Sequence, residues 1–218
     1  TWDSKTGSRL AQFAEGHQFL TSSAVVFPNG KWIATAAVDN TVHVWDLDSA
    51  TELFSLEPTG RAAAMSVSPD GNWIVTGSQG IKVDGKDRYT VKVWNVQKVL
   101  NLKKTCEPTQ EQPCNPEPAF ELKGMTENGY RGHFSEVTAV AISSDGTLAL
   151  SGDVGGRVLL WDLKTQTVKF DLEGHSPRFK ISSVAFLSDG KRAFSASFDK
   201  TVAQWDLTTG EEVKGAAL

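Results

Sequence analysis

The chain has 218 residues, of which 39% are hydrophobic and 22% charged, and its formal net charge is -4. This composition is typical of a folded globular protein, and no run of 18 or more apolar residues predicts a membrane span. The mild negative charge and the lack of a concentrated basic stretch argue against a nucleic-acid-binding module.

A Trp followed by Asp or Asn recurs along the chain and divides it into similar stretches. The pairs are Trp2-Asp3, Trp45-Asp46, Trp94-Asn95, Trp161-Asp162 and Trp205-Asp206. A period of roughly 43 residues with a Trp-Asp ending is the sequence mark of a four-stranded propeller blade. The longer intervals before Trp94 and Trp161 are interpreted as one repeat plus insertions.

Each repeat carries the same succession of turns and strands. In the first complete one, the turn Pro28-Asn29-Gly30 precedes alternating strands at 32–36 and 41–45 and a further strand at 52–56. Asn-Gly and Asp-Gly pairs tolerate the positive φ angles of hairpin turns, and Asp-Gly recurs at 70–71, 145–146 and 189–190. Helical periodicity is not found over a useful length, so the sequence predicts an all-β fold.

These features resemble the WD40 repeat family over essentially the whole chain. Blades of that family carry a buried polar network that joins a His after Gly, a Ser or Thr on the second strand, an Asp in the next turn and the Trp. The resemblance assigns this network to His17, Thr35, Asp39 and Trp45, to His133, Ser151 and Trp161, and to His175, Ser195, Asp199 and Trp205.

Two repeats depart from the family pattern. In the one ending at Trp161, Gly155 stands where Asp is expected. The one ending at Trp94 keeps Thr76, lacks the Gly-His pair and has its nearest acid at Asp87. We therefore expect these two blades to be held together less firmly.

The resemblance implies a β-propeller, a fold that closes with about four to eight blades and in this family mostly with about seven. We assign the end of a blade to 1–14 and blades to 15–57, 58–123, 124–173 and 174–218. The prediction is an incomplete arc of four four-stranded blades plus one partial blade. Because Thr1-Trp2-Asp3 would end a strand without its partners, we expect the missing blades to come from the rest of a larger protein or from another chain.

Three insertions lengthen the repeats. Two of them, at 79–88 and 125–131, belong to the same rim of adjacent blades and are expected to form a raised lobe, with a hairpin tip at 83–86. The third, 97–117, contains Cys106, Cys114 and three of the eight prolines, and is predicted to be an irregular loop on the opposite rim. It is either a tolerated insertion or a binding element, and a disulfide between the two cysteines stays an open alternative.

Candidate partner-binding residues come from two sources. Cations outnumber acids in the expected lobe, where Lys82, Lys86, Arg88 and Arg131 would make a basic spot suited to an acidic protein surface. The family resemblance adds positions at the start of the first strand and before the turn Asp, namely Leu20, Ser22, Val38, Arg61, Ala63, Glu136, Thr138, Val154, Lys180, Ser182 and Phe198. Val38 and Phe198 are apolar at turn positions that should be solvated, which favours protein contacts.

The His, Ser/Thr and Asp sets look like parts of a hydrolase triad. A catalytic constellation is normally built once, however, whereas this set recurs in several blades and includes a Trp that can only donate a hydrogen bond. We therefore interpret it as structural and predict no catalytic residue, cofactor or metal site. His43 is expected to be a solvated side chain, and Asp46 and Asp48 lack the Gly and Glu spacing of a calcium loop.

The sequence thus predicts a non-catalytic protein-interaction scaffold. Its expected partners are other proteins or other domains of the same protein, and not nucleic acid. One alternative is a propeller enzyme or small-ligand binder that uses the central channel, which would require acids, His or Cys from several blades to converge there. A purely architectural role in oligomerisation is a third alternative.

Overall fold

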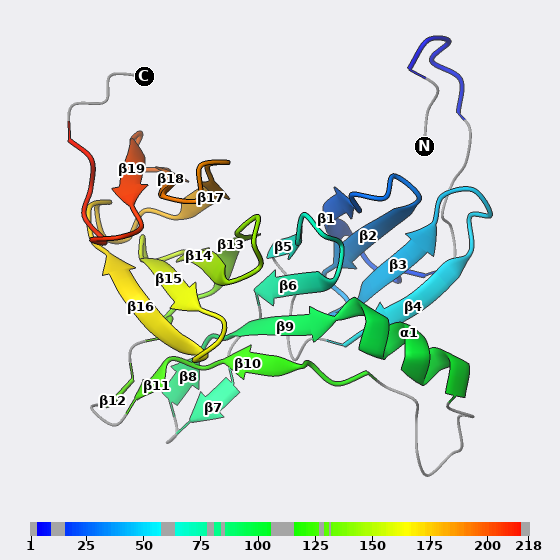
Figure 1. The fold of residues 1–218 in the computed structure, drawn as a ribbon, viewed down its shortest axis with the longest axis horizontal. Helices are drawn as coiled ribbons and strands as arrows, with labels where there is room; N and C mark the ends of the chain where they lie inside the picture. Colours follow the sequence, from blue (N-terminus) through cyan, green and yellow to red (C-terminus); the bar gives the residue numbers. More distant parts are fainter. Residues whose placement is uncertain are drawn as a thin grey trace.

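The computed structural model describes residues 4–9, 16–57, 64–77, 81–83, 86–105, 116–126, 129–130 and 132–214, without the side chains of 81–88 and 125–130. Within them the chain forms successive antiparallel sheets arranged in an open arc (Figure 1). We number the main sheets blades 1 to 4 in chain order. The fold is all-β apart from one helix.

Each blade is a meander of neighbouring antiparallel strands. Blade 1 contains β1 (Thr21–Val26), β2 (Trp32–Ala37), β3 (Val42–Asp46) and β4 (Glu52–Leu56). Blade 2 contains β5 (Ala64–Val67), β6 (Trp73–Gly77), β9 (Val91–Asn95) and β10 (Phe120–Leu122). Blade 3 contains β13 (Val137–Ile142), β14 (Leu148–Asp153), β15 (Val158–Asp162) and β16 (Thr167–Leu172). Blade 4 contains β17 (Ile181–Phe186), β18 (Arg192–Ser197) and β19 (Val202–Asp206).

A rudimentary fourth strand follows β19. The chain makes an isolated bridge between Trp205 and Glu212, and Val213 N donates to Gln204 O at 2.8 Å. The corresponding strand of blade 3, β16, half-buries Phe170 and fully buries Leu172, whereas 211–214 offers only one apolar side chain. Residues 215–218, and most of the partial blade assigned to 1–14, lie outside the described residues.

Apolar clusters fill the spaces between consecutive blades. Trp94, Trp161 and Trp205 are fully buried and each belongs to a different cluster, which joins its own blade to the preceding one. The innermost strands β1, β5, β13 and β17 contact one another in this order around the inside of the arc (Figure 1). Blade-to-blade packing rather than packing within a sheet therefore builds the core.

The insertion expected to be an irregular loop begins with a helix, α1 (Val96–Thr105). Asn95 caps its first turn, since the Lys98 amide donates to Asn95 Oδ1 at 2.8 Å. Val96 and Val99 are buried at i, i+3 spacing in the cluster between blades 1 and 2, where the helix packs against β4. The prediction of a loop over 97–117 was wrong for this part, because the apolar face is too short to give a visible helical period. The cysteines Cys106 and Cys114 lie outside the described residues. No helix in the described part of the chain is long and apolar enough to cross a membrane.

The cap predicts a measurable loss of stability. Asn95→Ala should lower the free energy of unfolding by about 1 kcal/mol in urea titration, because it removes the cap from the Lys98 amide. Asn101→Ala, an exposed change of the same type in the middle of α1, is the control and should change stability by less than about 0.5 kcal/mol. Equal losses in the two variants would show that the cap does not fix the helix.

The two rim insertions form short hairpins. β7 (Ile81–Val83) pairs with β8 (Lys86–Arg88), and β11 (Met125–Thr126) pairs with β12 (Gly129–Tyr130). Tyr89, directly after β8, bridges to His133, which follows β12 in the chain. The two hairpins therefore arise from the same rim of blades 2 and 3, as expected from the sequence.

Candidate functional site

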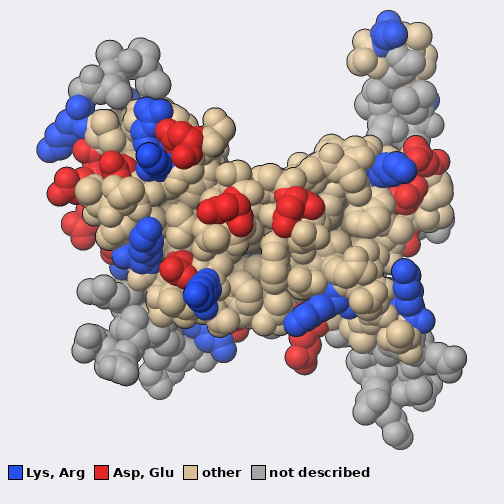
Figure 2. Space-filling view, viewed as in Figure 1, with Lys and Arg blue, Asp and Glu red and all other residues tan. Residues whose placement is uncertain are grey.

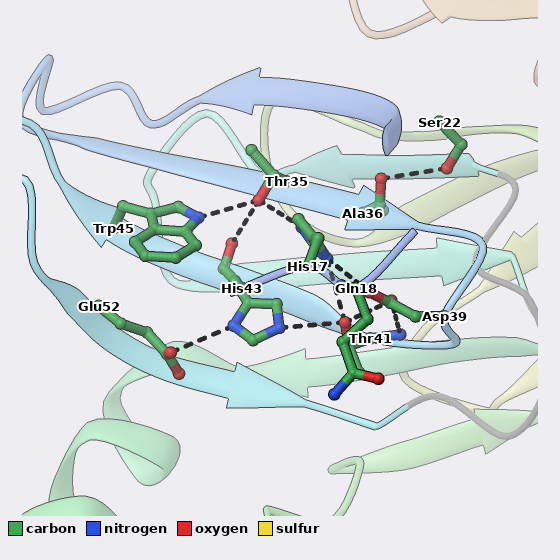
Figure 3. A network of polar contacts seen from close by, with 10 residues as sticks. All are labelled: His17, Gln18, Ser22, Thr35, Ala36, Asp39, Thr41, His43, Trp45 and Glu52. Carbon is green, nitrogen blue, oxygen red and sulfur yellow. Dashed lines mark hydrogen bonds and ion pairs between the residues drawn. The ribbon is translucent and has the colours of Figure 1, made fainter. Parts of the chain in front are cut away.

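A polar network crosses blade 1 (Figure 3). His17 Nε2 lies 2.8 Å from Thr35 Oγ1, and Trp45 Nε1 donates to the same oxygen at 2.9 Å. His17 Nδ1 lies 3.3 Å from Asp39 Oδ2. The structure therefore brings the four residues assigned by the family resemblance into one hydrogen-bonded chain.

Blade 4 repeats this geometry with shorter contacts. His175 contacts Ser195 Oγ at 2.7 Å through Nε2 and Asp199 Oδ2 at 2.9 Å through Nδ1, and Trp205 Nε1 donates to Ser195 Oγ at 2.8 Å. Burial alone would raise the pKa of Asp199, but hydrogen bonds from Thr201, the Ser176 amide and His175 together lower it well below its usual range. The carboxylate is thus held in its charged form at the turn.

Blade 3 has a complete network with a different acid. His133 Nδ1 lies 2.8 Å from Asp153 Oδ2, His133 Nε2 lies 2.6 Å from Ser151 Oγ, and Trp161 Nε1 donates to Ser151 Oγ at 2.7 Å. Asp153 lies two residues before Gly155, at the end of β14, and still reaches the imidazole. The expectation of a weakened network in this blade was wrong, because a carboxylate on the strand end fills the place of the turn Asp. All four side chains of this network are buried.

Blade 2 has a shorter network with other residue types. Trp94 Nε1 donates to Thr76 Oγ1 at 3.1 Å, and Thr90 Oγ1 donates to Glu121 Oε1 at 2.8 Å. Lys92 is buried opposite Glu121, and its pKa is lowered by burial, against the opposing effect of Glu121. The side chain of Asp87, the acid noted in the sequence, lies outside the described residues.

His43 is buried, contrary to the expectation of a solvated side chain. Only 8% of it is exposed, it stacks on Trp45 with ring centroids 5.5 Å apart, and its Nε2 lies 3.0 Å from Thr41 Oγ1 (Figure 3). Its Nδ1 lies 3.2 Å from Glu52 Oε2 on β4. The alternating pattern of β3 suggested exposure, but His17, from the loop before β1, packs edge-on against the His43 ring with ring centroids 4.5 Å apart. Burial and the electrostatic effect of His43 lower the pKa of the neighbouring His17, whereas the carboxylate of Asp39 raises it; the net direction is a lowered pKa.

A second repeated feature lies on the rim that carries the loops before each first strand. Val38 N donates to Leu20 O at 3.0 Å, and Phe198 N donates to Lys180 O at 2.9 Å. The same bond, also at 3.0 Å, joins Val154 N to Glu136 O. In blades 1, 3 and 4 the positions that the family resemblance assigned to binding are therefore adjacent pairs on one rim.

Large apolar side chains are exposed on this rim. Leu20 is 80% exposed and Phe198 63%, whereas Val38 and Glu136 are half-buried. Sequence reasoning missed Phe19, Phe134 and Phe179, which are also exposed and lie one or two residues before the assigned positions Leu20, Glu136 and Lys180. The available signal was an aromatic residue between the network His and the first strand, outside the strand alternation. We call the set Phe19, Leu20, Phe134, Val154, Phe179 and Phe198 the apolar rim.

Ser22, Thr138 and Ser182 lie at bulges of the innermost strands. Their hydroxyls donate to backbone carbonyls, with Ser22 bonded to Ala36 O at 3.2 Å and Ser182 to Ala196 O at 3.1 Å. Thr138 Oγ1 donates to Ile181 O of the next blade at 2.6 Å. The hydroxyls of these three assigned positions therefore donate hydrogen bonds to carbonyls within the chain. Arg61, Ala63 and Arg131, and the side chains of Lys82, Lys86 and Arg88, lie outside the described residues.

The repeats are also matched by a family model. The model described as "WD40: WD domain, G-beta repeat" matches residues 7–46, 53–95, 125–162 and 166–206. The chain belongs to the WD40 repeat family. Each matched stretch ends at or directly after one of the Trp residues that anchor the four blades.

Several curated proteins are similar to this WD40 chain. The small ribosomal subunit protein RACK1z of Arabidopsis thaliana is 39% identical over 158 residues, which are 71% of this chain and 43% of that protein. Mitochondrial division protein 1 of Schizosaccharomyces pombe is 30% identical over 75% of this chain and 24% of its own length. WD repeat-containing protein 18 of Bos taurus is 28% identical over 62% of this chain and 26% of its own length. The chain spans less than half the length of each of these relatives.

An open groove of about 260 Å³ lies on the inside of the WD40 arc. Its described lining residues are Ser22, Ser23, Ala64, Met65, Thr138, Ala139, Val140, Ser182, Ser183 and Val184. This lining contains hydroxyl and aliphatic groups but neither acids, His nor Cys, and the described residues include no cluster of His, Cys, Asp and Glu that could hold a metal ion. On the face drawn in Figure 2, uncharged residues cover most of the middle of the arc, with Lys and Arg mainly toward its margins.

Proposed function

We propose that this WD40 chain is a non-catalytic protein-interaction scaffold that binds other proteins, or other domains of its own protein, through the apolar rim. The observation that carries the proposal is the gathering of exposed aromatic and aliphatic side chains there. Leu20 and Phe198 belong to the two ends of the arc, and each is fixed by the same backbone hydrogen bond. Burying exposed aromatic side chains on a preorganised surface is a common source of binding energy between proteins.

The alternative of an enzyme or small-ligand binder in the channel has no comparable support. It would need acids, His or Cys from several blades to converge on the inner groove, and the described lining supplies hydroxyl and aliphatic groups. The His-containing networks are each closed by their own Trp, Ser or Thr, and Asp. Their repetition supports a role in stiffening the blades.

We also propose that further blades cover the two ends of the arc, with blade boundaries at 15–57, 58–123, 124–173 and 174–218. Val158 of blade 3 is fully buried by blade 4, whereas Val202, at the equivalent position of blade 4, is 50% exposed. Leu163 and Leu207 are buried by their preceding blades, whereas the equivalent Leu47 of blade 1 is only half-buried. The same surface that joins blades inside the arc is thus uncovered at its ends.

The scaffold proposal predicts that polar substitutions on the rim remove partners. The full-length protein with Leu20→Ser and Phe198→Ser should retain partner proteins at least about tenfold less than the wild type, because the apolar anchors are lost. The proteins that copurify with each variant are quantified by mass spectrometry. Val26→Ser is the matched control, since Val26 is 56% exposed at the other end of β1, near the opposite rim.

Two results decide between the outcomes. The scaffold role is supported if the variant with Leu20→Ser and Phe198→Ser loses partners of the wild-type protein that the Val26→Ser control retains. Full retention of every partner by a rim variant with an unchanged unfolding midpoint refutes it.

A further inference from the structure

Blade 4 adds positive charge to the apolar rim. Arg178, Phe179, Lys180, Phe198 and Lys200 are all exposed and lie in the two neighbouring loops of this blade. We call these five residues the basic-aromatic patch. Blade 1, at the equivalent rim, exposes Phe19 and Leu20, and its described loop residues 16–20 and 38–41 include no Lys or Arg. Blade 3 has Glu136 in place of Lys180, and its described cation–aromatic pair on this rim is Arg157 with Phe134.

The patch is held in a fixed geometry by backbone contacts. Phe198 N donates to Lys180 O at 2.9 Å, and Ser197 Oγ donates to Phe179 O at 3.2 Å. Lys180 Nζ lies 5.9 Å from the centroid of the Phe198 ring, which places cation and aromatic face side by side. A preorganised surface loses less conformational entropy when a partner binds.

Two of the cations occupy backbone positions that disfavour them. Arg178 has φ 74° and Lys200 has φ 75°, in the left-handed region that suits Gly and Asn. At the position equivalent to Lys200, blade 1 has Asn40 with φ 69° and blade 3 has Gly156 with φ 90°. Backbone preference therefore does not explain a Lys in blade 4, and its charge is the feature that blades 1 and 3 lack at this position.

Asp199, which lies between Phe198 and Lys200 in the chain, does not offset these charges at the surface. The side chain of Asp199 is 5% exposed and turned into the blade, where it accepts hydrogen bonds from the Thr201 amide at 2.9 Å and the Ser176 amide at 2.9 Å. Both oxygens are thus engaged by the network. Arg178, Lys180 and Lys200 project from a chain whose formal net charge is -4, so the patch is a local exception.

We propose that the basic-aromatic patch binds an acidic peptide segment of a partner protein, with carboxylates paired to Lys180 and Lys200 and an apolar side chain packed against Phe198. This inference rests on the proposed scaffold function, for which it names the partner chemistry on blade 4. An extended polyanion such as RNA fits less well, because the formal net charge of the whole chain is -4.

The experiment measures binding of a short fluorescein-labelled peptide, in which Glu residues flank a Phe-Leu pair, by fluorescence anisotropy. Wild-type protein should bind it with an affinity that falls as salt increases. Lys180→Glu combined with Lys200→Glu should weaken binding by at least about tenfold, because two attractions become repulsions. Lys164→Glu combined with Lys191→Glu is the charge-matched control, since both lysines are exposed in turns of the opposite rim. The control variant should bind like the wild type.

Several outcomes would overturn the inference. These are an absence of peptide binding, equal losses in the two double variants, equal binding of a peptide with Lys in place of Glu, or tighter binding of a single-stranded RNA oligonucleotide. If the Lys180→Glu and Lys200→Glu variant keeps all cellular partners while the Leu20→Ser and Phe198→Ser variant loses them, the scaffold function stands and the acidic-segment inference falls. If both variants keep all partners, the scaffold function itself falls. A circular dichroism spectrum and an unfolding midpoint equal to wild type establish that each variant is folded.

Discussion

Asp153→Ala lowers the free energy of unfolding by about 3 kcal/mol or more, the largest loss expected from a single side chain of the polar networks. In the wild-type protein His133 Nδ1 lies 2.8 Å from Asp153 Oδ2, and the side chains of His133 and Asp153 are at most 2% exposed. The substitution therefore leaves a buried His133 Nδ1 without its hydrogen-bond partner. It also removes the acceptor of the Arg157 amide, which donates to Asp153 Oδ1 at 3.0 Å. Urea unfolding followed by Trp fluorescence measures the change.

The matched control for this substitution is Asp145→Ala. Asp145 is exposed in the turn of the same blade on the opposite rim, where it accepts hydrogen bonds from the Thr147 amide at 3.1 Å, from Thr147 Oγ1 at 2.9 Å and from Ser143 Oγ at 2.6 Å. Its loss should reduce stability by about 1 kcal/mol, because water reaches this exposed turn and can replace the lost contacts. A variant Asp153→Ala that is as stable as Asp145→Ala would contradict the structural role of the blade 3 network.

Gly152→Ala is expected to destabilise the protein by about 2 kcal/mol or more by forcing blades 3 and 4 apart. A Cβ at position 152 would lie 2.7 Å from Ile181 Cβ, and Ile181 is fully buried at the start of β17. Because the obstacle is the base of a buried side chain beside the backbone, it has little room to move. The change is measured as the free energy of unfolding in urea.

A double-mutant cycle separates this contact from a general loss of stability. Ile181→Ala is itself destabilising, but combined with Gly152→Ala the total loss should fall short of the sum by about 1 kcal/mol, since the shortened side chain relieves the crowding. Gly155→Ala is the control on the same blade, because the nearest atoms to its Cβ, Ser135 Oγ at 3.1 Å and Asp153 Oδ1 at 3.3 Å, are less close and belong to blade 3 itself. If the stability losses of Gly152→Ala and Ile181→Ala simply add in the double variant, crowding between these two residues is not the cause of the loss in Gly152→Ala.

Local sequence patterns were enough to predict the repeats and their strands. The Trp positions, the Asp-Gly turns and the alternating strands specify a blade within about 40 residues, so nearly all of the information is local. The hairpin tip over 83–86 followed from its Asp-Gly turn, and the common rim of the two insertions followed from strand order. The helix α1 did not, because only Val96 and Val99 are buried and so short an apolar face gives no period.

Only the tertiary structure decided which side chains meet across strands and blades. Asp153 closes the network of blade 3 from a position two residues before the expected one, because what matters is the distance of its carboxylate from His133 and not its place in the motif. His43 is buried because His17 and Trp45 pack against its ring, which alternation within one strand cannot reveal. Phe19, Phe134 and Phe179 were passed over for the opposite reason, since only the packed arc shows that these side chains stay 66%, 56% and 47% exposed. The sequence by itself determined the blade, whereas the contacts between blades determined which residues are sealed inside and which remain on the rim for a partner.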